Sequence, residues 1–218
     1  MMNYKKLQIP GLYRIPGCDY EKIIKIYMDA FRSYPKLMSS FPDEEARIAA
    51  LEATLRFYVM YDLRYGAAFS LDESICEACI IVHSDNMKYS VPKHLLSGSY
   101  GRGYRTAMKK LTRQERKKRI QLFDELDRLE ADVKIPTPHI YVDFLGVAGS
   151  YQHQGRGRRL MSLICAYADE VKLPVMLFTN TDEDVTFYQS LGFDIIEITF
   201  SEKFGFTNTY MLYTPYNL

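Results

Sequence analysis

The sequence lacks any uninterrupted apolar run that approaches the ~20 residues of a membrane-spanning helix. Its first residues, Met1 to Lys6, are not followed by the apolar region of a signal peptide. These two absences predict a cytoplasmic protein that has no membrane partner.

Net charge is also nearly absent, because 28 Lys and Arg residues face 27 Asp and Glu residues and leave +1. Such a chain is not steered as a whole toward nucleic acid. The basic stretch Arg113 to Arg119 lies in a predicted helix, where Glu115 precedes Arg119 by four residues and Asp124 precedes Arg128 by four. We expect these charges to be paired, with no nucleic-acid partner. Steeply salt-dependent binding of DNA or RNA would instead indicate a nucleic-acid-associated protein.

Cysteine is scarce, and the four thiols are Cys18, Cys76, Cys79 and Cys165. Their low density and the missing signal peptide favour reduced thiols over disulfides. The pair Cys76-x-x-Cys79 lies in a strand-like run, where residues three apart point to opposite faces. No second such pair completes a set of ligands, so we expect no metal.

The composition suits one globular domain with a substantial core, since 47% of the 218 residues are hydrophobic and 25% are charged. Periodicity and turn residues predict the following elements before residue 138: a strand at Leu12–Ile15, a helix at Asp19–Arg32 that Pro35 ends, a helix after Pro42, strands at Gly66–Ser70 and Ile75–Val82, and a helix at Leu111–Val133. From Ser84 to Gly103 few residues indicate a regular element. Within this segment Gly98 to Gly103 is similar to a glycine-rich phosphate loop but follows no clear strand, so we expect a flexible connection instead.

A strand, a polar turn and a helix from Tyr141 to Val171 carry the strongest functional signal. Gly155 and Gly157 let the backbone bend and approach a ligand, where the first helical N–H groups are unpaired. The helix dipole and the nearby Arg156, Arg158 and Arg159 add positive charge, which predicts a phosphate or pyrophosphate site. A dinucleotide fingerprint would need glycine in place of Leu160, and a P-loop would need Gly-Lys-Ser/Thr, which does not occur.

The motif Gln152-x-x-Gly155-x-Gly157, after the strand segment Leu145-x-Val147, resembles the acyl-CoA-binding motif of the GNAT superfamily, the Gcn5-related N-acetyltransferases. Downstream, Phe187-Tyr188-Gln189-Ser190-Leu191-Gly192-Phe193 resembles the helix-to-strand segment that closes the same fold. The resemblance covers roughly Pro138 to Phe200. Pro138-His139-Ile140-Tyr141 is loosely similar to members that resemble puromycin N-acetyltransferase.

This resemblance implies a single α/β domain over residues 1–218, with a mixed, mostly antiparallel twisted sheet flanked by helices. Residues 1–83 would supply the first strand, two acceptor-side helices and a meander, 84–137 a helical insertion, and 138–218 the acyl-CoA-binding core and last strands. Six aromatic residues would either line an acceptor pocket or serve as plain core: Tyr34, Phe41, Phe57, Tyr58, Tyr61 and Tyr65.

By the same resemblance the acyl donor is acetyl-CoA. Backbone groups at Leu145 and Val147 would hold its pantetheine arm where the central strand splays from its neighbour. Backbone N–H groups from Gln154 to Arg158 would hold the pyrophosphate. The predicted cofactor-binding residues of this motif are Gln152, Gln154, Gly155, Arg156, Gly157 and Arg158. Asn180 is a further cofactor contact by resemblance, one residue from the position where many members carry asparagine.

For catalysis, Tyr188 occupies the position of the tyrosine that protonates the leaving thiolate in many members, although it would also suit a core position. Many members place a glutamate base where Tyr141 stands, which leaves Asp143 or His139 as candidates, or water alone. Strict alternation would place His139, Tyr141 and Asp143 on the same strand face as Leu145.

We therefore expect an N-acetyltransferase that moves an acetyl group to the primary amine of a small molecule in a ternary complex. A non-catalytic acyl-CoA-binding regulator and a protein N-acetyltransferase remain alternatives. Many relatives dimerise, so a homodimer is compatible with the resemblance.

Overall fold

The computed structural model describes residues 7–87 and 90–216. In this part of the chain the strands are β1 (Tyr13–Arg14), β2 (Ala67–Ser70), β3 (Glu77–His83), β4 (Ile140–Val147), β5 (Val175–Thr179), β6 (Phe193–Ser201) and β7 (Phe206–Tyr213). They form one sheet in the order β1-β2-β3-β4-β5-β7-β6. Only the β4–β5 pair is parallel among these strands. The mixed, mostly antiparallel sheet predicted from the sequence is therefore confirmed.

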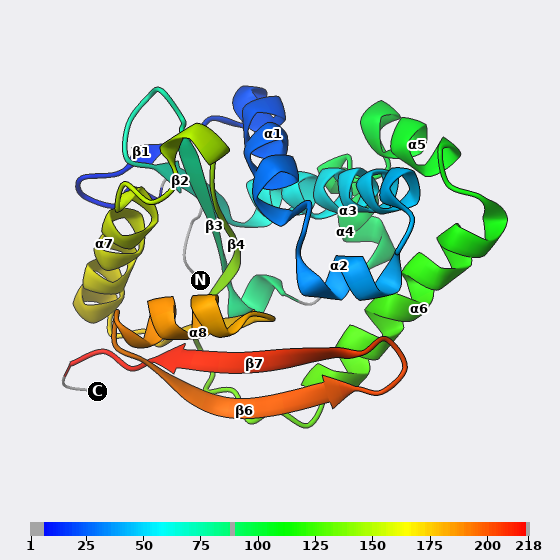
Figure 1. Ribbon diagram of the computed structural model, residues 1–218. Coiled ribbons are helices and arrows are strands. Elements are labelled where there is room, and N and C mark those ends of the chain that lie inside the picture. The colour runs from blue at the N-terminus through cyan, green and yellow to red at the C-terminus, as the bar shows by residue number, and fades with distance from the viewer. Residues whose placement is uncertain (1–6, 88–89, 217–218) are drawn as a thin grey trace.

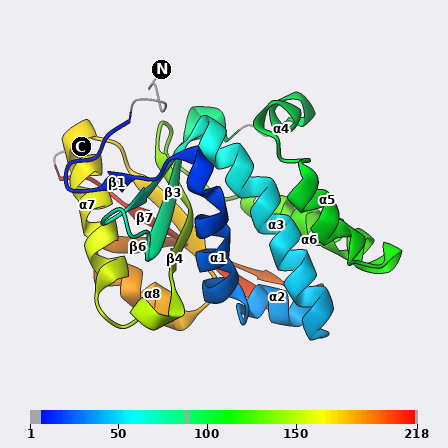
Figure 2. The same cartoon turned by 90° about the horizontal axis from the view of Figure 1, so that it is seen from above.

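Helices cover both faces of the sheet. They are α1 (Tyr20–Phe31), α2 (Pro35–Ser40), α3 (Glu44–Tyr65), α4 (Val91–Ser97), α5 (Arg102–Lys109), α6 (Arg113–Glu130), α7 (Arg156–Val171) and α8 (Asp182–Gln189), with single 3-10 turns at Gly17–Asp19, Ser84–Asn86 and Gly149–Tyr151. Helices α1 and α3 lie on one face and α7 on the other (Figures 1 and 2). None of the helices in the described ranges has the length and apolar character needed to cross a membrane.

Side-chain caps explain where several helices begin. The Asp43 carboxylate accepts a hydrogen bond from the backbone N–H of Ala46 at the start of α3 (2.8 Å). Thr112 and Glu115 form a reciprocal capping box at the start of α6. Thr181 accepts a hydrogen bond from the backbone N–H of Asp184 (3.0 Å) and so caps α8 at its start.

The sheet has a separate apolar core on each face. Val142 of β4 packs with Leu160 and Ile164 of α7 on one face. On the other face Phe144 of β4 stacks on Tyr27 of α1, with ring centroids 5.3 Å apart. Consecutive parts of β4 thus contribute to both cores, which makes β4 the structural centre of the domain.

The predicted flexible connection at 84–103 is wrong, because this segment contains α4 and the start of α5. A proline lies in the first turn of α4, where its missing N–H costs nothing. Gly98 ends α4 in the left-handed conformation (φ +82°), and Gly101 begins α5. The glycines therefore act as helix ends. Pro35, predicted only to end a helix, also begins the short helix α2.

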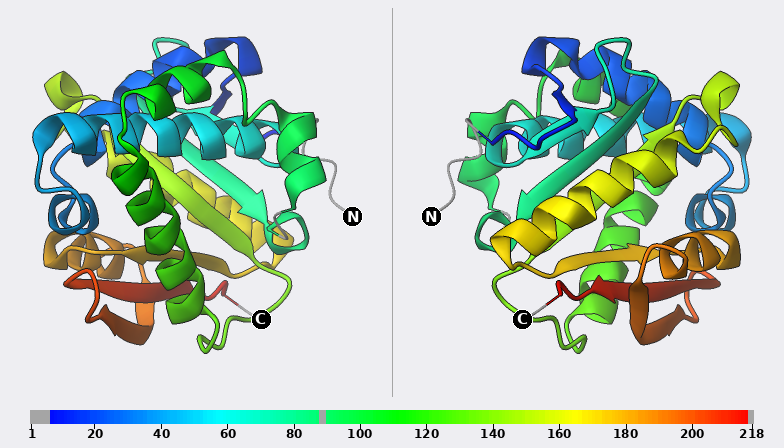
Figure 3. Two further views of the ribbon diagram at one scale, coloured as in Figure 1. Left: turned by 90° about the vertical axis from the view of Figure 1, so that its right-hand side faces the viewer. Right: turned by 90° about the vertical axis from the view of Figure 1, so that its left-hand side faces the viewer.

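Helix α6 bridges the two halves of the molecule (Figure 3). Near its start the Arg119 Nε donates to the Thr54 hydroxyl of α3 (3.1 Å), and near its end Glu125 accepts from the Ser201 hydroxyl of β6 (2.9 Å). The two ion pairs predicted along α6 are wrong. The Glu115 carboxylate is engaged by Thr112 in the capping box, and Arg128 pairs with Glu125 (2.9 Å) in place of Asp124.

The junction between α3 and the sheet leaves no room for a side chain at Gly66. A Cβ there would overlap the carbonyl oxygen of Ile81 and lie 3.0 Å from that of Asp62. We expect Gly66→Ala to lower the free energy of unfolding by about 1–3 kcal/mol, as overpacking does. Urea unfolding measures this change, with Gly17→Ala as the control, because a Cβ at Gly17 meets nothing within 4 Å. Equal unfolding midpoints for the two variants would contradict the prediction.

Candidate active site

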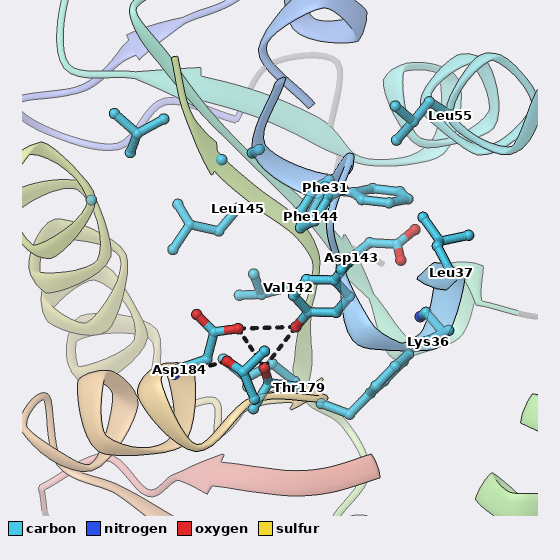
Figure 4. A pocket seen from close by; sticks show the side chains of 18 of the residues that line it. Phe31, Lys36, Leu37, Leu55, Val142, Asp143, Phe144, Leu145, Thr179 and Asp184 are labelled. Carbon is cyan, nitrogen blue, oxygen red and sulfur yellow. Dashed lines mark hydrogen bonds between the residues drawn. The ribbon is translucent and has the colours of Figure 1, made fainter. Parts of the chain in front are cut away.

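A cavity of about 670 Å³ lies beside β4. Its walls come from β4, the loop and first turn of α7, the end of β5, and α8 on one side, and from α1, α2, α3 and α6 on the other. Figure 4 shows side chains from several of these elements directed into it. This volume is in the range of sites for small molecules and cofactors.

The cavity lies where two parallel strands part. Strands β4 and β5 pair only at Ile140–Val175 and Tyr141–Met176, whereas β3 pairs with β4 as far as Val147. From Val142 onward the backbone of β4 therefore has no β5 partner in the described residues. Leu145 and Val147, the predicted pantetheine contacts, lie on this segment and line the cavity. Such a free strand edge can hydrogen-bond an extended polar chain.

The first turn of α7 borders the same cavity. Gly155 lies at its N-cap in the left-handed conformation (φ +76°), with no side-chain cap. The backbone N–H groups in the first turn of α7 therefore remain available to an anion. Gly157 also lines the cavity, and a Cβ there would lie 3.5 Å from Val147 Cγ2. The Gln152 side-chain amide donates to the Val147 carbonyl (3.0 Å) and so holds this loop against the end of β4.

The arginines around this turn differ in what they contact. Arg156 pairs with the fully buried Glu77 and with Asp72 (2.8 Å), and these partners, Glu77 first, raise the pKa of its guanidinium. Its side chain thus joins α7 to the start of β3, while the residue also lines the cavity, so its contact with a pyrophosphate stays a prediction. Arg158 donates to the Ser190 hydroxyl (2.7 Å) and lines the cavity.

Tyr188 of α8 lies in the cavity wall with 8% of its surface exposed. Its ring packs on Phe193, with centroids 5.5 Å apart, so the ring belongs to the core. Its hydroxyl has no hydrogen-bond partner among residues 7–87 and 90–216. Burial raises the pKa of this phenol well above 10, so the group stays protonated at neutral pH.

Asp143 also lines the cavity, but on the other side of β4 from Leu145 (Figure 4). The expectation that both share a face is wrong, because β4 bulges there: Ile80 pairs with Phe144 and Ile81 with Val142, which leaves Asp143 without a partner on β3. An extra residue in one strand reverses the alternation beyond it. Asp143 therefore faces the acceptor-side helices.

Two ionisable groups, Asp62 and Lys36, interact with Asp143. Burial raises the pKa of its carboxyl, while Asp62 of α3 and Lys36 of α2 oppose the rise. Burial and the Asp143 charge raise the pKa of Asp62 well above its ordinary value. In the part of the chain that the structure describes, both oxygens of Asp62 are buried without a donor, so its protonated carboxyl can donate to Asp143. Burial lowers the pKa of Lys36 to about 8, and its Nζ lies 4.8 Å from the Phe178 ring centroid.

Three predicted residues do not line the cavity. The His139 Nδ1 lies 2.6 Å from the Pro136 carbonyl, and its ring is buried outside the cavity wall. The Asn180 side chain donates to the Thr207 carbonyl (2.5 Å) and to Asn208 (2.6 Å), so it ties β5 to β7. The Gln154 side-chain amide donates to the Ser150 carbonyl (3.0 Å). Only the backbone of this residue is therefore left to contact an anion at the first turn of α7.

A polar network across the cavity wall was not predicted. The Tyr34 hydroxyl donates to the Asp184 carboxylate (3.0 Å), which also accepts from the Thr179 hydroxyl (2.8 Å). Tyr34 and Phe41 are the two aromatic residues of the six predicted candidates that line the cavity. Sequence reasoning also missed Lys36, Asp62 and Arg119.

A recognisable signal existed for two of these residues. Asp62 falls seven residues after Leu55, on the apolar stripe of α3, and Arg119 three residues before Leu122, on that of α6. A charged residue on a buried stripe indicates a functional or paired group.

Residues 120–195 match the family model of the acetyltransferase (GNAT) domain. No curated protein matches the sequence significantly. The fold is similar to the histone acetyltransferase HPA2-related acetyltransferase of Corynebacterium glutamicum (TM-score 0.62, 14% identity, 97% of this chain and 99% of that one). It is also similar to the ribosomal-protein-S18-alanine N-acetyltransferase of Escherichia coli (0.51, 12%, 95% and 97%) and to an agmatine N-acetyltransferase (0.54, 13%, 93% and 98%).

The matched residues include the splayed part of β4, the glycine turn and Tyr188, so the family match and the cavity describe the same part of the molecule. The chain therefore has the fold of these acetyltransferases, and its residues 120–195 match the GNAT domain model.

Proposed function

We propose that the chain transfers the acetyl group of acetyl-CoA directly to the primary amine of a small molecule. The observation that carries this proposal is the cavity at the β4–β5 splay, which joins a free strand edge and an uncapped helix N-terminus to a walled acceptor side. The match of residues 120–195 to the acetyltransferase domain supports the same reaction.

The donor would lie along β4 and α7. Backbone groups at Leu145 and Val147 would bind the pantetheine arm, and N–H groups from Gln154 to Arg158 would bind the pyrophosphate. Gln152 would act by holding the loop through Val147. A thioester held on β4 would then have its carbonyl beside the cavity, next to Tyr188.

The reaction requires an amine to attack this thioester carbonyl. The amine nitrogen forms the new C–N bond, the C–S bond breaks, and the CoA thiolate leaves with the electron pair. Tyr188, protonated and without another partner, would give its proton to the sulfur. Asp143 would accept one proton of the incoming ammonium, directly or through water, while Lys36 favours its ionised form. The second proton that the nitrogen loses on becoming an amide would return to the Tyr188 phenolate and restore the phenol.

The acceptor-side walls favour a small molecule over a polypeptide. Helix α6 of the insertion contributes Arg119, Leu122, Phe123 and Leu126 to the cavity, opposite α2 and α3. A peptide needs an open groove, whereas helices on this side narrow the space to one compact ligand.

Acetyl-CoA binding is the first test of the donor site. We expect Gly157→Glu to weaken binding at least 30-fold, which corresponds to about 2 kcal/mol. The new carboxylate would occupy the anion site formed by the backbone N–H groups from Gln154 to Arg158. Calorimetric titration measures the Kd. Ser162→Glu is the control, because it adds the same charge on the exposed side of α7. Equal Kd values for all three proteins would refute the donor site, and binding without acetylation of any amine would indicate the non-catalytic regulator.

The role of Tyr188 can be separated from its packing. We expect Tyr188→Phe to lower kcat by about 100-fold, as loss of a general acid does, with little change in the Kd of acetyl-CoA. The rate of thiol release in the presence of an amine acceptor measures kcat. Tyr213→Phe is the matched control, because Tyr213 packs on the same Phe193 (5.6 Å) but lies outside the cavity wall. An unchanged kcat in Tyr188→Phe would assign Tyr188 to the core alone.

The pH profile tests Asp143 as the base. Its carboxylate accepts a proton only above its raised pKa, so wild-type kcat/KM should rise with pH through that value and then level off. In Asp143→Asn the amine must lose its proton to solvent. The smaller kcat/KM should then keep rising until the pKa of the amine itself, near ~10. Profiles of the same shape would exclude Asp143 as the base.

A further inference from the structure

A buried cation lies in the acceptor-side wall, away from the reacting centre. Arg119 of α6 has only 6% of its surface exposed and contributes to the cavity wall. Its Nε donates to the Thr54 hydroxyl (3.1 Å), and its guanidinium carbon lies 4.8 Å, 5.8 Å and 6.0 Å from the ring centroids of Phe123, Tyr104 and Phe57. Three rings and one hydroxyl thus hold the guanidinium in place.

Among residues 7–87 and 90–216 this cation has no anionic partner. None of the ion pairs within the described ranges includes Arg119, and its NH2 group is buried without a hydrogen-bond acceptor. Glu115, four residues earlier, is engaged in the capping box. Burial lowers the pKa of the guanidinium, with partial compensation from Tyr104 and Tyr58. A buried charge without a counter-ion is costly, and aromatic rings offset only part of that cost.

Arg119 and Asp143 line the same cavity, but they contact helix α3 at different points along its length. The Arg119 contact is Thr54, and the Asp143 contact is Asp62, eight residues later on that helix. At 1.5 Å per residue the two contacts lie about 12 Å apart along the helix axis. The wall near Thr54 is apolar, with Leu51, Leu55 and Phe123.

We infer that the acceptor carries an anionic oxygen group, a carboxylate or phosphate, which Arg119 binds, and that an apolar body of roughly 8–12 Å separates this group from the reacting amine. This inference rests on the proposed function, since it assigns the amine to the Asp143 end. Lys36, the other cation of this wall, faces Asp143 and so belongs to the amine end.

A series of ω-aminocarboxylates from six to twelve carbons, each beside its methyl ester, tests the inference. The ester removes the anion and keeps the chain. We expect wild-type kcat/KM to favour the acid over the ester for chains that span the two ends, and to pass through a maximum with length. Arg119→Met should reduce this acid-to-ester ratio about 10- to 100-fold, as loss of a charged hydrogen bond does, mainly through KM of the acid.

Lys117→Met is the matched control, because it removes the same charge from the exposed side of α6 and should keep the wild-type ratio. Replacement of a buried charge by an apolar side chain is often neutral or stabilising, so Arg119→Met should fold. Arg119→Lys should restore part of the ratio, since it retains the charge but not the planar fork.

Direct binding keeps the two proposals distinguishable. Calorimetry of the acids and esters with the CoA-bound protein reports the anion contact without catalysis. Binding of acids that depends on Arg119, but without acetyl transfer, supports the inference and refutes the proposed function. Acetylation of esters and acids at equal rates refutes the inference and leaves the function intact. An acid preference lost in Lys36→Met but kept in Arg119→Met also overturns it.

Discussion

The parallel contact between β4 and β5 ends after two residue pairs, and the rest of the site depends on that ending. A fully paired β4 would have no free backbone groups for a ligand, and α7 would have no cavity beyond its first turn. The remaining contacts hold the two halves of the sheet in place around the opening. Strand β3 supports β4 along its length, β7 supports β5, and α6 bridges α3 and β6.

Charge burial follows the same division of the molecule. On the donor side the buried Glu77 is neutralised by Arg156, and this ion pair fixes α7 to the sheet. The anion site at the first turn of α7 is then formed mainly by backbone N–H groups. On the acceptor side Asp62, Asp143, Lys36 and Arg119 are buried or line the cavity, and several lack full partners. Buried charged groups destabilise a fold unless a ligand or a shared proton compensates them. Because these groups lie in or next to the wall of one cavity, a bound ligand could offset the cost of burying them.

Much of the donor side could be predicted from the sequence because its determinants are local. The strand, the glycine turn and the cap at Thr181 each involve residues within a few positions of one another, and local geometry decides them. Helices α2 and α4 were missed because proline and glycine were taken only as breaks, although both residues also begin and end helices.

The sequence by itself determined the fold class and the position of the glycine turn, since periodicity and short motifs encode them. Only the tertiary structure decided which side chains reach the cavity. The bulge at Asp143 turned it away from Leu145, and the partner of Arg156 came from β3. Helix packing brought Arg119 to the cavity wall and Asp62 next to Asp143. These outcomes depend on contacts between residues far apart in the chain, and no local pattern specifies such contacts.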